Sequence, residues 1–340
     1  MPTHYSGDFV QFSSGTTGLR KQIAYQGKAL RLHNEAYALA LSAKKDERVI
    51  SWLPHYHDMG LIACMLMPLQ LGYDIIAMSN LSWVSKPQML VDAILKHDAT
   101  LCWQPNFAFQ MMAERCASAD LSKTRFISCA EPVFDRVSQR FEEHFSTTVR
   151  GCYAMAENVF AVTQAASART MKGFRTSGKV FESNQVRIID DEIAIRSDYL
   201  FSGYQSGETM RSKDGWYLTG DHGALVEDEL FVFGRVDDSF KVRGEKIIPE
   251  LIEAEANMIP GVKPGRIACV AGENSDHEEV AVLIYEGSLS ESDLYKQVRH
   301  LGIERCVQVP ANWLVKSSSG KVARKQCRLK LASNLQPEQK

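Results

Sequence analysis

The 340-residue sequence lacks the features that mark several large classes of protein. Its formal net charge is only -2, so bulk electrostatics give no reason to expect a nucleic-acid partner. The longest apolar stretch, residues 61–77, is interrupted by Pro68, Gln70, Gly72 and Asp74. It therefore predicts buried core and no membrane span. The first residues show no cationic and apolar signal pattern, and we expect a cytoplasmic protein that acts without a membrane or nucleic acid.

Paired cysteines are also lacking. The eight cysteines are scattered and none forms a C-x-x-C pair, so neither a zinc site nor a disulfide framework is indicated. Reduced thiols in the cytoplasm are the simplest interpretation. The chain is 45% hydrophobic and 24% charged, as ordinary globular proteins are, and its length favours two domains.

The first two-thirds of the chain alternates helix-like and strand-like segments. Residues 86–96 repeat apolar side chains at helical spacing after a proline, and residues 124–129 are typical of a short buried strand. Residues 186–188 and 193–195 predict a hairpin around two aspartates. We therefore expect an α/β core that is followed by a β-rich portion.

The last hundred residues form a different pattern. A helix is predicted from Pro249, strands at residues 267–270 and 280–285, and a capped helix after Ser290. This pattern predicts a small, separate α+β unit.

The most informative segment lies at residues 13–21, after a short apolar run. It reads Ser13, Ser14, Gly15, Thr16, Thr17, Gly18, Leu19, Arg20 and Lys21. Glycines let backbone N–H groups approach an anion closely, and hydroxyls and a cation add donors and charge. A Ser/Thr/Gly surface turn is the alternative. Two residues separate Gly15 from Gly18, so this is not the Walker loop, and no third glycine makes a dinucleotide fingerprint.

This spacing resembles the phosphate loop of the acyl-adenylate-forming (AMP-binding) superfamily, which includes acyl-CoA synthetases, fatty acyl-AMP ligases and peptide-synthetase adenylation domains. Further blocks follow in the family's order, at residues 51–61, 130–132, 153–158, 216–221, 234–244 and 316–321. The resemblance covers nearly the whole chain. It implies ATP and Mg²⁺ as cofactors, with residues 13–18 and Lys21 at the phosphates.

The resemblance also implies roles for the adenosine and metal sides of the site. Tyr153 would stack on adenine, and Asp221 would accept hydrogen bonds from the ribose hydroxyls. Glu157 and Thr17 would hold Mg²⁺, since a hard cation prefers oxygen ligands. The turn at the adenine side is Ala130, Glu131 and Pro132. The chain departs from the family pattern at Ala154 and Ala156, where glycine and threonine are usual; taken alone, Tyr153 and the Thr-Gly-Asp turn are ordinary core and turn residues.

Four further residues take roles from the same resemblance. Arg235 would contact ribose or phosphate, and Asp237 would be the pivot of a hinge. Lys321 would bridge the carboxylate and the α-phosphate, where a positioned ammonium stabilises developing charge. His57 would be a catalytic residue at the acyl and phosphate end. The alternatives are solvated charge runs at residues 234–244 and 316–330, and for His55 and His57 a metal site on one face of a strand.

Residues 83–87, 105–109 and 130–133 look most similar to fatty acyl-AMP ligases. Those enzymes pass the acyl group to the phosphopantetheine of a carrier protein. Their usual insertion after the Tyr153 block is absent here, so CoA stays open as the acceptor beside an acyl carrier protein. Trp103 and Gln104 predict a shortened, partly polar acyl pocket and hence a small or functionalised carboxylic acid; ordinary core is the alternative.

The expected organisation is an α/β adenylate-forming core over residues 1–233, a hinge over 234–238 and a mobile α+β domain over 239–340. Relatives carry a long subdomain before the phosphate loop, whereas this chain has a dozen residues there. We expect a second protomer or a partner protein to cover the exposed flank. A non-catalytic, partner-dependent nucleotide-binding or carrier-binding protein is the rival function. A luciferase-like oxygenase has no separate support.

Overall fold

The computed structural model describes residues 8–12, 21–129, 131–205, 212–274, 276, 278–316 and 322–335. It divides into two compact units, Met1–Val232 and Phe233–Lys340. The boundary falls within strand β17 (Glu229–Arg235), one residue before the boundary that the sequence predicts between residues 233 and 234. The predicted site residues outside the described residues are Ser13, Ser14, Gly15, Thr16, Thr17, Gly18, Ala130 and Lys321.

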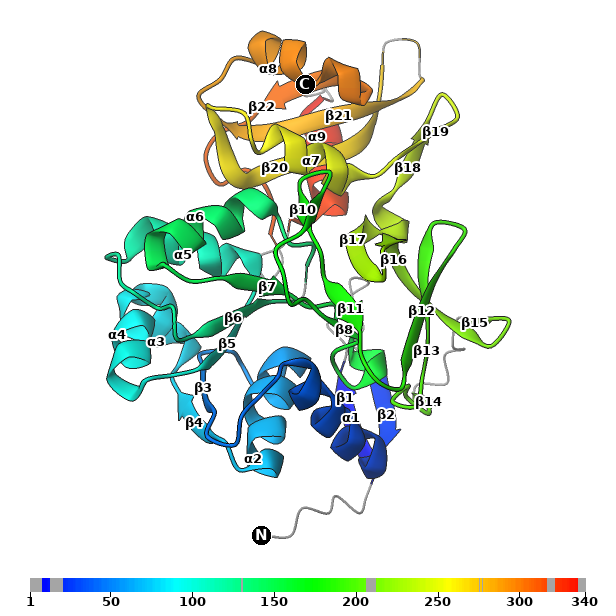
Figure 1. Ribbon diagram of the computed structural model, residues 1–340. Helices are drawn as coiled ribbons and strands as arrows, with labels where there is room; N and C mark the ends of the chain where they lie inside the picture. Colours follow the sequence, from blue (N-terminus) through cyan, green and yellow to red (C-terminus); the bar gives the residue numbers. More distant parts are fainter. Residues whose placement is uncertain are drawn as a thin grey trace. The chain divides into compact units, whose positions relative to one another are not determined.

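A five-stranded parallel sheet forms the centre of the first unit, with the order β4–β3–β5–β6–β7. Its strands are short, and most of their residues are buried, because helices lie on both faces (Figure 1). The strands are β3 (Arg48–Ser51), β4 (Asp74–Ala77), β5 (Leu101–Gln104), β6 (Arg125–Ser128) and β7 (Val149–Gly151). The strand predicted at residues 124–129 is confirmed as β6.

Register and contacts assign the two faces of this sheet. Trp103 of β5 packs against Tyr37 of α1, whereas Phe126 of β6 packs against Phe109 and Phe141 of α5 and α6. The helices of this unit are α1 (Gly27–Ala40), α2 (Met67–Leu71), α3 (Asn80–Ser85), α4 (Gln88–His97), α5 (Asn106–Arg115) and α6 (Asp135–Phe145). The helix predicted at residues 86–96 is confirmed as α4.

The β-rich portion is a seven-stranded sheet, with β15 paired at one side of β16 and the order β12–β13–β16–β17–β11–β8. Both hairpins turn on acidic residues with positive φ. Asp190 and Asp191 have φ of 52° and 65°, and Glu227 and Asp228 have 52° and 67°, which suits tight hairpin turns. The other strands are β8 (Thr163–Gln164), β11 (Gly178–Val180), β12 (Asn184–Ile189), β13 (Glu192–Ser197), β15 (Ser212–Lys213) and β16 (Trp216–Val226).

Two small sheets complete the described part of this unit. The first has the order β1–β2–β14, and the second is the hairpin of β9 and β10. Their bounds are β1 (Asp8–Phe12), β2 (Gln22–Gln26), β14 (Gly203–Tyr204), β9 (Thr170–Met171) and β10 (Phe174–Arg175). Strands β1 and β2 flank residues 13–20, so the predicted phosphate-loop segment connects two antiparallel neighbours.

The second unit is built on the sheet β20–β21–β22, in which β21 pairs antiparallel with β20 and parallel with β22. Side chains of β21 (Glu279–Gly287) alternate between two cores. Leu283 and Tyr285 pack in a core shared with α7 and α8, and Val282 and Ile284 pack in a core shared with α9. The apolar run at residues 280–285 is therefore buried on both faces.

The remaining elements confirm the predicted α+β pattern of the second unit. Ser290 caps α8, because its hydroxyl accepts a hydrogen bond from the Asp293 N–H at 3.2 Å. The elements are η3 (Val236–Asp238), β18 (Phe240–Val242), β19 (Glu245–Ile247), α7 (Pro249–Ala256), β20 (Val262–Glu273), α8 (Glu291–Val298), η4 (Arg299–Leu301), β22 (Ile303–Gln308) and α9 (Arg324–Leu335).

Candidate active site

The structure joins the residues predicted for adenine and ribose. Tyr153 follows β7 and is 6% exposed, and its hydroxyl donates a hydrogen bond to Asp221 Oδ2 at 2.7 Å. Asp221 lies in β16, where its backbone N–H is bonded to the Thr219 hydroxyl at 3.2 Å. The preceding Gly220 has φ of 80°, a conformation that favours glycine. Two blocks that are 68 residues apart therefore meet at one pair of side chains.

Glu157 accepts a hydrogen bond from Tyr204, and Tyr204 in turn contacts Tyr217 and Lys21. It sits in the short helix η2 (Ala156–Asn158), and the Tyr204 hydroxyl donates to Glu157 Oε1 at 3.0 Å. The Tyr204 and Tyr217 hydroxyl oxygens are 3.1 Å apart. Lys21 Nζ lies 4.7 Å from the centre of the Tyr204 ring. Glu157, which is predicted to hold Mg²⁺, and Lys21, which is predicted to bind phosphate, thus contact the same tyrosine.

Sequence reasoning missed Tyr204 and Tyr217 as site residues. Tyr217 lies inside the block at residues 216–221, so its place in a recognised motif could have pointed to it. Tyr204 lies in the two-residue strand β14 and belongs to no motif, so the sequence offers no signal for it.

Strands β1 and β2 hold the turn that carries Glu157. Gln11 Nε2 donates to the carbonyls of Ala156 and Val159 at 3.2 and 3.1 Å, and the Tyr25 hydroxyl donates to Ala156 O at 2.6 Å. Burial, then the charges of Asp58 and Glu157, raise the pKa of Tyr25 well above its ordinary value. Those two carboxylates therefore act on the same phenol, which remains a neutral donor.

His57 lies in a turn before the π-helix η1 (Met59–Leu66) and not in a strand, so the strand alternation that the alternative metal site at His55 and His57 would need is absent. His57 Nδ1 is 2.5 Å from Asp58 Oδ1, and Asp58 also accepts the Met59 N–H at 2.8 Å. The reason is that Asp58 caps the following helix and ends the extended chain.

Within the described ranges, no group of three or more His, Cys, Asp or Glu side chains could hold a metal ion. Mg²⁺ in nucleotide sites uses one or two carboxylates together with phosphate oxygens and water. The half-buried carboxylate of Glu157 fits that requirement.

The turn predicted for the adenine side is anchored to α5 through Glu131 and Pro132. Glu131 Oε1 accepts the backbone N–H of Asn106 at 3.0 Å, and the Asn106 amide donates to the Pro132 carbonyl. A carboxylate at the first turn of a helix is favoured by the helix dipole. Glu131 and Pro132 therefore have a structural function besides the one predicted for them.

Trp103 and Gln104 do not line an accessible pocket, which corrects the prediction of a shortened acyl pocket at these residues. Both are 0% exposed. Trp103 Nε1 donates to the Tyr37 hydroxyl at 3.0 Å, and Gln104 Oε1 accepts from Trp52 Nε1 at 3.3 Å. They lie on opposite faces of β5 and have protein partners, so they belong to the core.

The second unit carries the remaining predicted residues. Arg235 ends β17 and precedes η3, in which Asp237 and Asp238 are exposed. The Ser239 hydroxyl donates to the Val236 carbonyl at 2.7 Å and closes this short helix. The predicted pivot thus lies in a single turn between a buried strand and the body of the unit.

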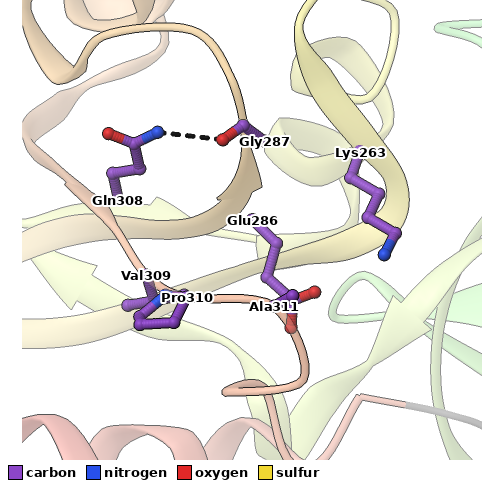
Figure 2. A pocket seen from close by; sticks show the side chains of 7 residues that line it. All are labelled: Lys263, Glu286, Gly287, Gln308, Val309, Pro310 and Ala311. Carbon is purple, nitrogen blue, oxygen red and sulfur yellow. Dashed lines mark hydrogen bonds between the residues drawn. The ribbon is translucent and has the colours of Figure 1, made fainter.

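A hollow of about 490 Å³ lies in the second unit, at the ends of β21 and β22. Figure 2 shows the side-chain amide of Gln308, which donates to the Gly287 carbonyl at 2.9 Å. Glu286 and Lys263 also line the hollow. The predicted site residues are not among its lining residues. Among the described helices of the chain, none is long and apolar enough to cross a membrane.

Comparison with known proteins identifies the family. Residues 8–205 match the AMP-binding enzyme family, and the chain belongs to it. A 4-hydroxyphenylalkanoate adenylyltransferase of Mycobacterium bovis is 27% identical over 352 residues, which cover 83% of this chain and 56% of the relative. A long-chain-fatty-acid–AMP ligase of Mycobacterium marinum is 24% identical over 412 residues, which cover 96% of this chain and 70% of the relative. The chain thus spans between about half and about two-thirds of the length of these relatives.

The fold is that of adenylate-forming enzymes. A solved structure from work on the fatty acyl-adenylate ligases of E. coli and L. pneumophila matches with a TM-score of 0.78 at 23% identity. The match covers 96% of this chain and 69% of that one. The expected fold class, an adenylate-forming α/β core followed by a small α+β unit, is confirmed.

Proposed function

We propose that this protein activates a carboxylic acid with ATP to give an acyl-adenylate and pyrophosphate, and then transfers the acyl group to a thiol. The observation that carries the proposal is the hydrogen bond between Tyr153 and Asp221 at 2.7 Å, with Glu157 beside Tyr204 and Lys21 in the same unit. These side chains offer an aromatic face, a diol acceptor, a carboxylate and a cation. Adenosine, ribose, magnesium and phosphate need those four chemistries.

In the first step the acid's carboxylate attacks the α-phosphorus of ATP, a P–O bond forms, and pyrophosphate leaves. Residues 13–18 and Lys21 bind the phosphates, and Tyr153, Asp221, Arg235 and the turn 130–132 bind the nucleoside. Lys321 stabilises the charge that builds on the phosphoryl oxygens. His57 faces the acyl end. Mg²⁺, held by Glu157 and Thr17, neutralises phosphate charge when bound.

In the second step the unit that follows the hinge rotates about Asp237, withdraws Lys321 and exposes the mixed anhydride to a thiol. All eight cysteines are buried, and burial raises the pKa of both Cys64 and Cys306 to about 12. Such thiols are poor nucleophiles at neutral pH, so the thiol comes from the acceptor. An acyl carrier protein or CoA supplies it.

The names of the relatives guide the proposed acid, and the cysteines guide the proposed compartment. One is named for 4-hydroxyphenylalkanoates and another for long-chain fatty acids, so we propose an aryl- or alkyl-carboxylic acid. The eight cysteines are unpaired, which suits the reducing cytoplasm.

The test is acid-dependent pyrophosphate release from Mg-ATP over 4-hydroxyphenylpropanoate, octanoate, palmitate and acetate. We expect release with one class of acid, and its loss in Lys321→Ala, because the variant lacks the ammonium at the reacting phosphate. Lys325→Ala is the matched control, since Lys325 is exposed on α9. ATP binding without release for every acid would favour the non-catalytic, partner-dependent alternative.

A further inference from the structure

A buried guanidinium surrounded by three carboxylates lies in the second unit, and none of these four side chains has a role in the proposed chemistry. Arg324 is the first residue of α9, and its side chain is 15% exposed. The carboxylates come from Glu250 and Glu253 on α7 and from Asp238 at the end of η3. One arginine therefore connects three elements of the same compact unit.

The inner half of this cluster is fixed. Arg324 Nε and Nη2 donate to the two oxygens of Glu253 at 2.8 and 2.7 Å, a bidentate pair. Glu253 Oε1 also accepts the backbone N–H of Cys269 in β20 at 2.8 Å. Nη1 donates to Glu250 Oε1 at 2.7 Å. Glu250 and Glu253 are 6% and 5% exposed, so these bonds anchor α9 on α7 and β20.

The outer half reaches the hinge segment. The same Nη1 donates to Asp238 Oδ2 at 2.6 Å, and the Asp238 side chain is 40% exposed. Asp238 follows the proposed pivot Asp237 directly. Water can replace the bond at this carboxylate, whereas it cannot reach the inner pair, so the bond to Asp238 is the one that can open without unfolding the unit.

The chain that precedes Arg324 is also held by backbone contacts. Lys316 and Val322 form an antiparallel bridge, and the Ala323 N–H donates to the Val315 carbonyl at 2.9 Å. These contacts fix both ends of the segment that contains Lys321. Arg324 comes three residues after Lys321, so the arginine that holds Asp238 follows closely on that segment in the chain.

We infer that the Asp238–Arg324 bond is a latch that holds the hinge turn in one conformation relative to the start of α9, which makes Asp238 a positioning residue. The inference rests on the proposed two-step function. The latch restrains backbone rotation next to the pivot, and a hinge must change its backbone angles when the unit turns. The latch stabilises one hinge conformation over another. Removing the latch therefore changes the ratio of the rates of the two half-reactions.

The test compares Asp238→Asn with Glu255→Gln in the full chain. Glu255 is the matched control, since it is an exposed carboxylate on α7 that pairs with His300 at 2.8 Å and does not touch Arg324. Acid-dependent ATP–pyrophosphate exchange reports the first step, with the acid that works best for the wild-type chain. Transfer from preformed acyl-adenylate to CoA or a phosphopantetheinylated carrier protein, in single turnover, reports the second.

We expect Asp238→Asn to change the ratio of the two rates by about five-fold or more, with unchanged thermal unfolding. Glu255→Gln should leave the ratio unchanged. An equal fall in both rates, or no change in either, overturns the inference.

Hydrogen exchange separates failure of the latch from failure of the proposed function. Amides of residues 236–242 should exchange about five-fold faster or more in Asp238→Asn than in the wild-type chain. This measurement needs no substrate. Wild-type protein that releases no pyrophosphate counts against the function, while unchanged exchange in Asp238→Asn counts against the latch.

Discussion

Among the described residues, each of the two units holds an arginine that is surrounded by carboxylates. The two clusters differ in the number of carboxylates that contact the arginine. In the first unit Arg175 is 3% exposed and binds Asp135 and Glu142, both on α6. In the second unit Arg324 binds Glu250, Glu253 and the more exposed Asp238. Two carboxylates accept most of the hydrogen bonds that Arg175 donates. Arg324 has a third carboxylate, that of Asp238, which connects it to η3.

The second cluster contains a carboxyl group, that of Glu250, whose pKa is raised. Burial raises the pKa of Glu250 to about 7, and the charges of Glu253 and Asp238 act in the same direction while Arg324 opposes them. The comparison teaches that a carboxyl group buried at such a cluster can keep its proton up to about pH 7. The same cluster keeps one bond at its edge that solvent can replace.

The largest expected effect comes from removing either arginine. Arg324→Met and Arg175→Met should each cost about 3–5 kcal/mol, because the remaining carboxylates stay buried without a counter-charge. Calorimetry of the full chain should show the loss in the transition of the unit that carries the substitution. Arg328→Met, on the exposed side of α9, is the control. A loss in the other unit's transition would contradict this assignment.

A second expected effect is a pH dependence of the second unit. The folded pKa of Glu250 is about 7 against an ordinary value of 4.5, so the folded state holds this proton more tightly. The stabilisation is present below pH 4.5 and is lost as pH rises through 7, by up to about 3 kcal/mol. Glu250→Gln keeps the bond from Arg324 and should flatten this dependence. An unchanged slope in the variant would show that another group is responsible.

The first unit should respond to pH in the opposite direction. Burial lowers the pKa of His33 from 6.5 to about 4, and its Nε2 lies 3.0 Å from the Ala161 carbonyl oxygen. The unfolded chain binds this proton first, so stability is lost as pH falls from 6.5 to 4, by about 3 kcal/mol. His33→Gln should remove most of this acid sensitivity. The pH profiles of the two transitions test the contrast between the units, and parallel profiles would contradict it.

The smallest expected effect on the free energy of unfolding comes from substituting Asp238, at the exposed edge of the second cluster. Asp238→Asn should cost less than about 1 kcal/mol, because a partly exposed ion pair contributes little to stability. Asp135→Asn in the first cluster should cost more, since Asp135 is 21% exposed and its partner is almost fully buried. Urea unfolding of the two variants checks the order. Equal losses would show that the edges of the two clusters do not differ.

The sequence predicts elements whose pattern is local. Helix α4, strand β6 and the hairpin on Asp190 and Asp191 follow from apolar period and turn chemistry, and the structure contains them. The strand that the alternative metal site at His55 and His57 would need is absent, because Asp58 accepts the Met59 N–H at the start of the next helix and a side-chain cap competes with an extended chain.

The candidate site is predictable where it consists of motifs and not where it depends on contacts between them. Tyr153, Glu157 and Asp221 stand in recognisable blocks, but Tyr204 belongs to none. Arg324 was hidden in a run of basic residues, although it shares one helix face with Cys327 and Leu331, which are buried. That spacing of three and seven residues is a signal that it points inward.

By itself, the sequence determined the class of fold, the membership of the AMP-binding family and the types of side chain available for nucleotide chemistry. These follow from patterns within short segments, where local sterics and hydrogen bonding decide. Only the tertiary structure decided that Tyr153 meets Asp221, that Trp103 and Gln104 are core, and that Arg324 joins the segment predicted to be the hinge to α9. Such contacts depend on chain segments tens of residues apart, and no local pattern encodes which distant partner a buried polar group finds.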